Sequence, residues 1–307
     1  MPGRDGLTFV NRRWGASMSK QSGRARLPAR VAGQFTVGAS VVRHVWGHPA
    51  NQGRQTRALL RAAGYQARAR LLRRRATARL GERSRLWVDL HRTAASAVLY
   101  ANPPDLPEML AWRRALRAGD LFVDVGANVG TYAIWTAELG AEVIALEPAP
   151  DTFALLEENI ALNGYPVTAM RAAAGDHCGW ARFTAGLDTG NSLSRDGQIV
   201  TRLVTVDSLI GSRPVAGMKI DVEGFEIDVL RGAARALAGH RIGLIQIEWN
   251  QMSTLAKGAD RQPIADLLAG HGYQLYRPDP TGQLIPVADP GFGADVFASP
   301  GPEGFAS

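Results

Sequence analysis

The sequence contains almost no cysteine or lysine and no long apolar run. Its one cysteine, Cys178, excludes an internal disulfide and cannot build a zinc site from several thiolates. No apolar run approaches the roughly 18 to 20 residues that cross a bilayer, and residues 1–15 lack the apolar stretch of a signal peptide. We therefore expect a soluble, cytoplasmic protein.

Charge is distributed unevenly along the 307 residues. Residues 1–85 hold 19 basic and 2 acidic side chains, a net charge of +17, whereas residues 86–307 hold 16 and 26, a net charge of −10. This predicts a basic arm joined to an acidic domain. We expect a disordered arm at 1–35 or an over-extended start with Met18 as the true one, a basic helical extension at 36–85, a catalytic domain at 86–300 and a tail at 301–307.

A helical pattern between Arg54 and Arg75 dominates the extension. Its arginines at 54, 57, 61 and 68 share one face, and Leu59, Leu60, Ala63, Ala67 and Leu71 lie roughly on another. We interpret the arginines as a solvated face of a helix that packs on the catalytic domain or on a second subunit. The alternative is peripheral contact with an anionic membrane or with phosphates, although the lack of interleaved aromatics disfavours nucleic acid.

From Leu86 onward the pattern alternates between short apolar strands and helices, which is typical of an α/β fold with a parallel sheet. The expected strands are 121–125, 142–146, 167–171, 218–222 and 242–249, with an antiparallel closing pair at 273–277 and 294–298. The expected helices are 128–139, 151–162, 225–237 and 261–269.

A glycine-rich turn, Gly126-Ala-Asn-Val-Gly130, joins the first of these strands to its helix. Such a turn lets the backbone come close to a ligand and directs N–H groups at it. A dinucleotide fingerprint would have glycine at 128, where this chain has Asn128, so a pyrophosphate is disfavoured. S-adenosylmethionine (SAM) has no pyrophosphate, and backbone groups together with Asp124 can hold its amino-acid end.

Glu147 follows the second strand, 17 residues beyond Gly130. A carboxylate at that edge of the sheet can accept hydrogen bonds from both ribose hydroxyls. Capping of the strand ends is the structural alternative for Asp124 and Glu147.

Four segments together resemble the FkbM family of SAM-dependent methyltransferases: residues 122–130, Glu147-Pro148, residues 158–164 and Lys219-Ile-Asp-Val-Glu-Gly-Phe-Glu226. The resemblance implies a Rossmann-like class I methyltransferase fold of seven strands, the last antiparallel. It also implies methyl transfer, usually to a hydroxyl oxygen of a sugar or natural product. The predicted cofactor residues are Asp124, Gly126, Ala127, Asn128, Gly130, Glu147 and Ala174.

The predicted catalytic residues are Lys219, Asp221 and Glu223, which alternate onto one side of an extended strand. An alcohol becomes a good nucleophile once its proton is accepted, so Asp221 or Glu223 is the candidate base and Lys219 modulates their charge. Glu248 and Asn250, after the next strand, are predicted to contact the substrate.

Other interpretations of these residues stay open. Asp221, Glu223 and Glu248 could instead hold a divalent cation such as Mg²⁺ that polarises the hydroxyl. Lys219 could simply form a strand-end ion pair. Glu226 and Asp228 are expected to face solvent at a helix N-terminus.

Asn102-Pro-Pro-Asp105 resembles a base-binding motif of amino methyltransferases but lacks its aromatic residue. We interpret it as a proline-stiffened turn. Two rival functions remain: a nucleic-acid methyltransferase that grips phosphates with the arginine arm, and a non-catalytic SAM-binding scaffold.

Overall fold

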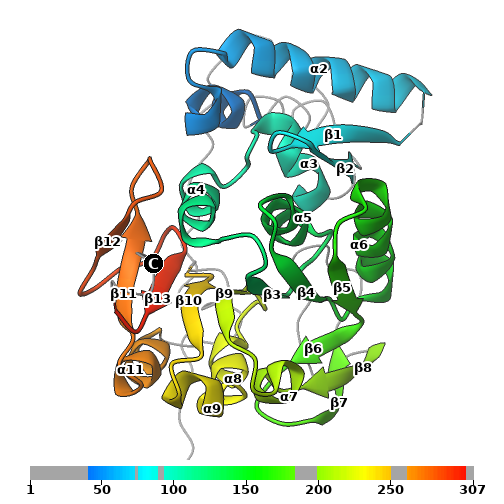
Figure 1. Ribbon diagram of the computed structural model, residues 1–307. Helices are drawn as coiled ribbons and strands as arrows, with labels where there is room; N and C mark the ends of the chain where they lie inside the picture. Colours follow the sequence, from blue (N-terminus) through cyan, green and yellow to red (C-terminus); the bar gives the residue numbers. More distant parts are fainter. Residues whose placement is uncertain (1–40, 73–74, 89–92, 184–198, 250–260, 302–307) are drawn as a thin grey trace, which may run out of the picture. The chain divides into compact units, whose positions relative to one another are not determined.

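The computed structural model describes residues 41–72, 75–88, 93–183, 199–249 and 261–301 (Figure 1). The expected arm at 1–35 lies outside the described residues, as does all but the first residue of the expected tail. None of the described helices combines the length and apolarity that a membrane span requires.

A sheet with the strand order β12-β11-β13-β10-β9-β3-β4-β5 forms the centre of the described chain. Its strands, in chain order, are β3 (Leu121–Val125), β4 (Glu142–Leu146), β5 (Val167–Met170), β9 (Val215–Ile220), β10 (Ile242–Ile247), β11 (Gln274–Pro278), β12 (Leu284–Pro286) and β13 (Val296–Ser299). The first five run parallel, and β13 is antiparallel to β10 and β11. The expected fold class and antiparallel last strand are confirmed, and β12 adds an eighth, edge strand.

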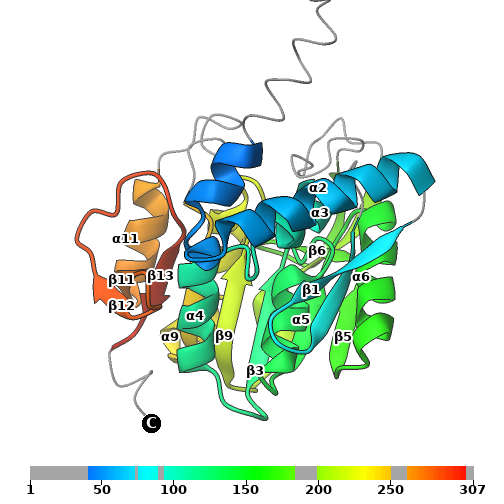
Figure 2. The same cartoon turned by 90° about the horizontal axis from the view of Figure 1, so that it is seen from above.

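Helices cover both faces of this sheet (Figures 1 and 2). One face carries α4 (Leu106–Ala115), α5 (Thr131–Glu138) and α6 (Pro150–Asn163), and the other carries α7 (Val206–Ile210), α8 (Glu226–Arg231), α9 (Ala234–Ala238) and α11 (Gln262–Gly270). Strand residues alternate between the two cores: Phe122 packs under α4 and α5, and Val123 packs on the opposite side. The strand order reverses between β3 and β9, and ligands of such sheets bind beyond the strand ends at that point.

The helix expected at 225–237 is in fact two helices, α8 and α9, which is a correction. The break falls at Gly232, whose backbone lies so close to Gly175 that a Cβ would be 2.0 Å from the Gly175 carbonyl oxygen. Gly175 follows β6 (Ala172–Ala174), which forms an unexpected three-stranded sheet with β7 (Gly179–Phe183) and β8 (Ile199–Val204). Close contact with this small sheet interrupts the helical run.

The basic helix is present as α2 (Gln55–Leu72), but its buried face differs from the expected one. Ala58 and Ala62 are buried, whereas Leu60 is 73% exposed. Small alanines let α2 lie close to α3 (Thr93–Tyr100), and this packing decides which face is covered. Arg61, expected on the solvated face, donates from Nε to the Leu99 carbonyl at 2.9 Å, near the C-terminus of α3.

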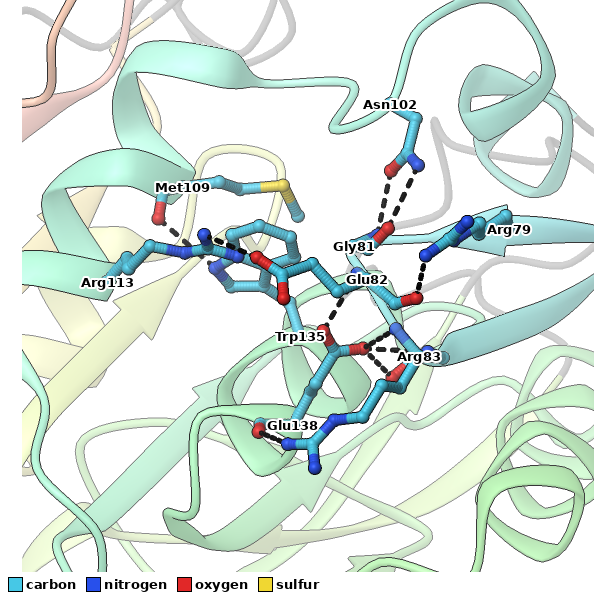
Figure 3. A network of polar contacts seen from close by, with 10 residues as sticks. Arg79, Gly81, Glu82, Arg83, Asn102, Met109, Arg113, Trp135 and Glu138 are labelled. Atoms are coloured by element: carbon cyan, nitrogen blue, oxygen red, sulfur yellow. Dashed lines mark hydrogen bonds and ion pairs between the residues drawn. The ribbon is translucent and has the colours of Figure 1, made fainter.

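A hairpin of β1 (Ala76–Leu80) and β2 (Ser84–Val88) follows α2, so the expected boundary after residue 85 falls inside β2. Glu138 of α5 fixes its turn, as Figure 3 shows. The carboxylate accepts backbone N–H groups of Glu82 at 2.9 Å, Arg83 at 3.2 Å and Ser84 at 2.7 Å, as well as the Ser84 hydroxyl. These bonds hold the pKa of Glu138 below its usual value despite its burial.

Candidate active site

The glycine turn lies where the carboxyl ends of β3 and β9 meet. Gly126 has φ +83°, and a Cβ there would lie 1.9 Å from the Asp221 carbonyl oxygen. Asn128 has φ +51°, and Gly130, the N-cap of α5, has φ +93°. The left-handed backbone and the close approach explain why glycine occupies 126. The turn predicted from sequence therefore packs directly on the predicted catalytic segment.

The N–H groups of this turn are already bonded within the protein. Gly126 and Ala127 donate to the Leu146 carbonyl at 3.0 and 2.8 Å, and Gly130 donates to the Ala127 carbonyl. Asn128 N–H donates to Glu147 Oε2 at 3.0 Å, and Val129 N–H donates to the Asn128 side chain. The expectation that the turn offers free N–H groups is wrong, because the turn uses them to hold its own shape.

Asp124, at the end of β3, offers an acceptor beside the turn. Its side chain is 1% exposed and accepts from the Ala133 N–H in the first turn of α5. Its Oδ2 has no hydrogen-bond partner among the described residues. Burial, with a smaller contribution from the Asp221 charge, raises the pKa of Asp124 to about 6, although Lys219 opposes the shift. A buried acceptor without a donor fits a ligand that brings one.

Glu147 joins the turn to the end of β4. Its Oε2 binds the Asn128 N–H, and its Oε1 accepts the Ala149 N–H at 2.8 Å. Burial raises its pKa to about 7. Glu147 therefore caps the strand end, as the structural alternative predicted. Each of its carboxylate oxygens retains a second lone pair that can accept another hydrogen bond. Ala127 and Ala174 are buried core residues, and Ala174 lies in β6 beside β8; its contact with a cofactor stays a prediction.

The predicted catalytic residues meet at the end of β9, although not by strand alternation. The strand ends at Ile220, and Glu223 and Gly224 have φ of +52° and +97°. This left-handed turn nevertheless brings Glu223 to Asp221 and Glu248, with one carboxylate oxygen of each within 4.8 Å of the others. We refer to Asp221, Glu223 and Glu248 as the carboxylate cluster. Asn250 lies outside the described residues.

Lys219 is a buried cation at the base of this cluster. Its Nζ lies 2.6 Å from Asp221 Oδ2 and 4.7 Å from the centre of the Tyr132 ring. Burial alone would lower its pKa, but the charges of Asp221, Asp124 and Asp295 raise it above the usual value. Lys219 is therefore charged and paired, as the ion-pair interpretation required.

Burial and neighbouring charges raise the pKa of two carboxyl groups in the cluster. Burial first, and then the charges of Asp221 and Glu226, raise the pKa of Glu223 to about 7. Burial and the charges of Asp221 and Glu223 raise the pKa of Glu248 well above its usual range. A group that titrates near pH 7 is suited to general acid–base work.

Glu226 was expected to face solvent, and that expectation is wrong. The side chain is 1% exposed and lies 2.7 Å from Arg261 Nη1 through Oε2, while Oε1 accepts the Gly224 N–H at 2.9 Å. A buried arginine from the N-terminus of α11 provides the counter-charge that makes burial tolerable. Asp228 is half-buried and pairs with Arg231 at 3.1 Å.

Four further residues join the site that sequence reasoning did not select: Asp105, Tyr132, Gln246 and Asp295. Gln246 is fully buried and donates from Nε2 to the Tyr132 hydroxyl at 3.1 Å and to Asp295 Oδ2 at 2.7 Å. The Tyr132 hydroxyl in turn bonds the Asp105 carboxylate. One signal was visible in the sequence: Gln246 is a polar residue inside an apolar strand.

Comparison with known proteins gives a family match over this site. Residues 124–275 match the methyltransferase FkbM domain. The hexuronic acid methyltransferase AglP of Haloferax volcanii is 30% identical over 156 residues, which cover 49% of this chain and 62% of AglP, so the chain spans less than two thirds of that relative. The 31-O-demethyl-FK506 methyltransferase FkbM of Streptomyces tacrolimicus is 29% identical over 200 residues, which cover 52% of this chain and 75% of that enzyme.

Solved structures are more distant. The 16S rRNA N2 G1207 methyltransferase RsmC of T. thermophilus has a TM-score of 0.41 and 15% identity, with 74% of this chain and 50% of that chain covered.

Proposed function

Since the chain belongs to the FkbM family of methyltransferases, we propose that it transfers the methyl group of SAM to a hydroxyl oxygen of a sugar or natural product. The observation that carries this proposal is the close packing of Gly126 on Asp221, because the turn that we expect to hold the cofactor then lies against the carboxylate cluster. A donor held by the turn and an acceptor held by the cluster would be neighbours at the reversal point of the sheet.

The residues around the turn fit SAM. The unpartnered Oδ2 of Asp124 can accept from the ammonium group of the methionyl end, and the remaining lone pairs of Glu147 can accept ribose hydroxyls. Bound SAM supplies a methyl group that is already activated by a sulfonium. The protein therefore has to orient the acceptor and take its proton.

We assign proton acceptance to Glu223. Its pKa of about 7 leaves a substantial deprotonated fraction at neutral pH while keeping the carboxylate basic. Asp221 is occupied by the Lys219 ammonium at 2.6 Å, so this pair holds the cluster in place and limits its negative charge. Glu248, whose pKa lies well above its usual range, keeps its proton at pH 7 and can donate a hydrogen bond to the acceptor oxygen.

A divalent cation is the alternative role for the same cluster. Three carboxylates within 4.8 Å match the hard oxygen ligands of Mg²⁺. Burial first, and then mutual repulsion, raise the pKa of Glu223 and Glu248, and a cation would relieve the repulsion. Against it, Lys219 already neutralises Asp221. We favour the role of the cluster as a base. Removal of metal ions with a chelator distinguishes this role from a cation site.

The relatives support the acceptor class. The name of the Streptomyces relative gives 31-O-demethyl-FK506 as the molecule that it methylates, and the name of AglP gives a hexuronic acid. The proposal for this chain is accordingly a hydroxylated small molecule or glycan.

The test is mass spectrometry of glycan and metabolite extracts incubated with isotopically labelled SAM, together with calorimetry of SAM binding. We expect micromolar binding and a labelled O-methyl ether. Binding without label transfer to any acceptor would favour the scaffold. Label transfer to RNA or DNA, with affinity that falls steeply with salt, would favour the nucleic-acid enzyme.

A further inference from the structure

Asp105 occupies a helix N-terminus without capping it. It is the N-cap residue of α4, a position where aspartate usually accepts from the first free N–H groups, yet its side chain makes no capping hydrogen bond. The carboxylate instead bonds the Tyr132 hydroxyl and lies in the field of Lys219. The Asp105 carboxylate is therefore held by a residue distant in sequence and not by the helix that it precedes.

The direction of the bonds in this network follows from its donors. Trp112 Nε1 can only donate, and it donates to Gln246 Oε1, which fixes the amide orientation. Gln246 Nε2 must then donate to the Tyr132 hydroxyl, so the hydroxyl oxygen is an acceptor there. The Tyr132 proton is left for Asp105, and the carboxylate is fixed in orientation with lone pairs to spare.

The backbone that carries Asp105 is held at three points by the N-terminal extension. Asn102 exchanges two hydrogen bonds with Gly81 of the hairpin turn, at 2.7 and 3.2 Å, as Figure 3 shows. Asn51 donates to the Tyr100 carbonyl at 2.7 Å. His48 accepts the Ala50 N–H at Nδ1, so its Nε2 carries the proton that it donates to the Pro104 carbonyl at 2.6 Å.

The charges around Lys219 indicate what such a carboxylate would bind. Asp105, Asp124, Asp221 and Asp295 all act on Lys219, the one cation they share within the described residues. Lys219 is already paired with Asp221, and Arg261 is paired with Glu226. The described part of the site is thus rich in hydrogen-bond acceptors, and each of these two cations already has a carboxylate partner.

We propose that Asp105 binds the hydroxyl groups of the acceptor and selects uncharged sugars over sugar acids. The proposal rests on the proposed function. It departs from the substrate named for AglP, because a carboxylate on the acceptor would meet Asp105, Asp295 and the cluster, while Lys219 and Arg261 of the described residues are already paired. Asp105 as a whole residue is exposed, so an acceptor can reach it, although burial of its carboxyl group raises the pKa of that group.

The test compares a methyl hexopyranoside with the corresponding methyl hexuronide, which differ only in a CH₂OH or a carboxylate group. Saturation-transfer NMR measures the binding of each sugar to the complex of the protein with S-adenosylhomocysteine. The rate of methylation of each sugar is measured with labelled SAM. We expect the wild-type protein to bind and methylate the neutral sugar at least about tenfold better. Asp105→Asn should raise KM for that sugar by about tenfold with a smaller change in kcat and unchanged SAM affinity.

Two variants sharpen the result. Tyr132→Phe removes the proton that orients Asp105 and should raise KM in the same direction. Asp176→Asn neutralises an exposed carboxylate outside this network and should leave both sugars unaffected. Preference for the hexuronide, no detectable binding of the neutral sugar, or an unchanged KM in Asp105→Asn would overturn the proposal. Failure of SAM to bind would instead count against the proposed function.

Discussion

The α-carbon of Gly126 faces the carbonyl oxygen of Asp221 so closely that a methyl group on it would lie 1.9 Å from that oxygen. Asp221 N–H also donates to the Val125 carbonyl at 3.0 Å, so the turn and the end of β9 are joined by a hydrogen bond as well as by contact. A change at Gly126 is therefore transmitted to the predicted chemistry.

Gly126→Ala is expected to disturb both cofactor binding and stability. Its φ of +83° costs an alanine about 1 to 2 kcal/mol, and the clash adds about 1 to 3 kcal/mol. The matched control is Gly164→Ala, which has φ +69° and no atom within 4 Å of the added Cβ. Denaturant unfolding and SAM calorimetry measure both variants; equal destabilisation would show that the contact with Asp221 does not matter.

Lys219→Met should destabilise the protein by about 3 to 5 kcal/mol, because it leaves buried carboxylates without their cation. Arg213→Met breaks the half-exposed ion pair with Glu142 and should cost less than about 1 kcal/mol. Urea unfolding compares them. A small cost at Lys219 would mean that the carboxylates take up protons at no penalty.

Glu223 should give the rate its pH dependence. A base must be deprotonated to accept a proton, and burial with neighbouring charges raises its pKa to about 7, so kcat should rise with pH and level off above that value. Glu223→Gln should lower kcat by about a hundredfold and remove the inflection. The control is Glu157→Gln on the exposed side of α6. An unchanged inflection in Glu223→Gln would assign the base elsewhere.

Methyl transfer is expected to be independent of added metal. Lys219 supplies the positive charge that the carboxylate cluster needs, at 2.6 Å from Asp221. Rates with EDTA and with added Mg²⁺ should agree, and thermal unfolding should not shift. Loss of activity in EDTA with recovery in Mg²⁺, together with stabilisation of about 2.7 kcal/mol at a hundredfold excess over the dissociation constant, would support the cation site.

Glu138→Gln should destabilise the hairpin by about 2 to 3 kcal/mol, since the carboxylate accepts three backbone N–H groups and one hydroxyl. Its pKa is lowered in the folded protein, so its contribution is present above about pH 4.5 and is lost as the pH falls through the folded value. Glu157→Gln, at an exposed position of α6, is the control. The difference in melting temperature between wild type and Glu138→Gln should be full at pH 7 and should shrink as the pH is lowered below about 4.5.

The features that could be predicted from the sequence are those whose residues lie close together along the chain. The glycine turn and the segment from Lys219 to Glu223 carry their chemistry within a few residues, and both lie at the same edge of the sheet. Glu226 and Gln246 could not be placed in this way, because their partners are distant in sequence. Arg261 is 35 residues from Glu226, and Trp112 is 134 residues from Gln246.

Asp105 shows a different limit. Its proline-rich surroundings predicted a turn, and Asn102 does hold one. A turn and a binding site are not alternatives, however, since a stiff turn is a good support for a functional side chain. Its orientation is determined by Tyr132 and Gln246, which no local pattern reveals.

The hydrogen bonds that Glu138 accepts from the hairpin limit where the chain can be cut when a segment is exchanged between related proteins. Residues 86–307 alone would begin inside β2, remove β1 and leave Glu138 facing no donors from the hairpin turn. Recombination or truncation at that boundary would also release Asn102 from Gly81. A transferable unit therefore has to begin ahead of Ala76, and swapping the upstream segment between relatives is expected to change acceptor preference as well as stability.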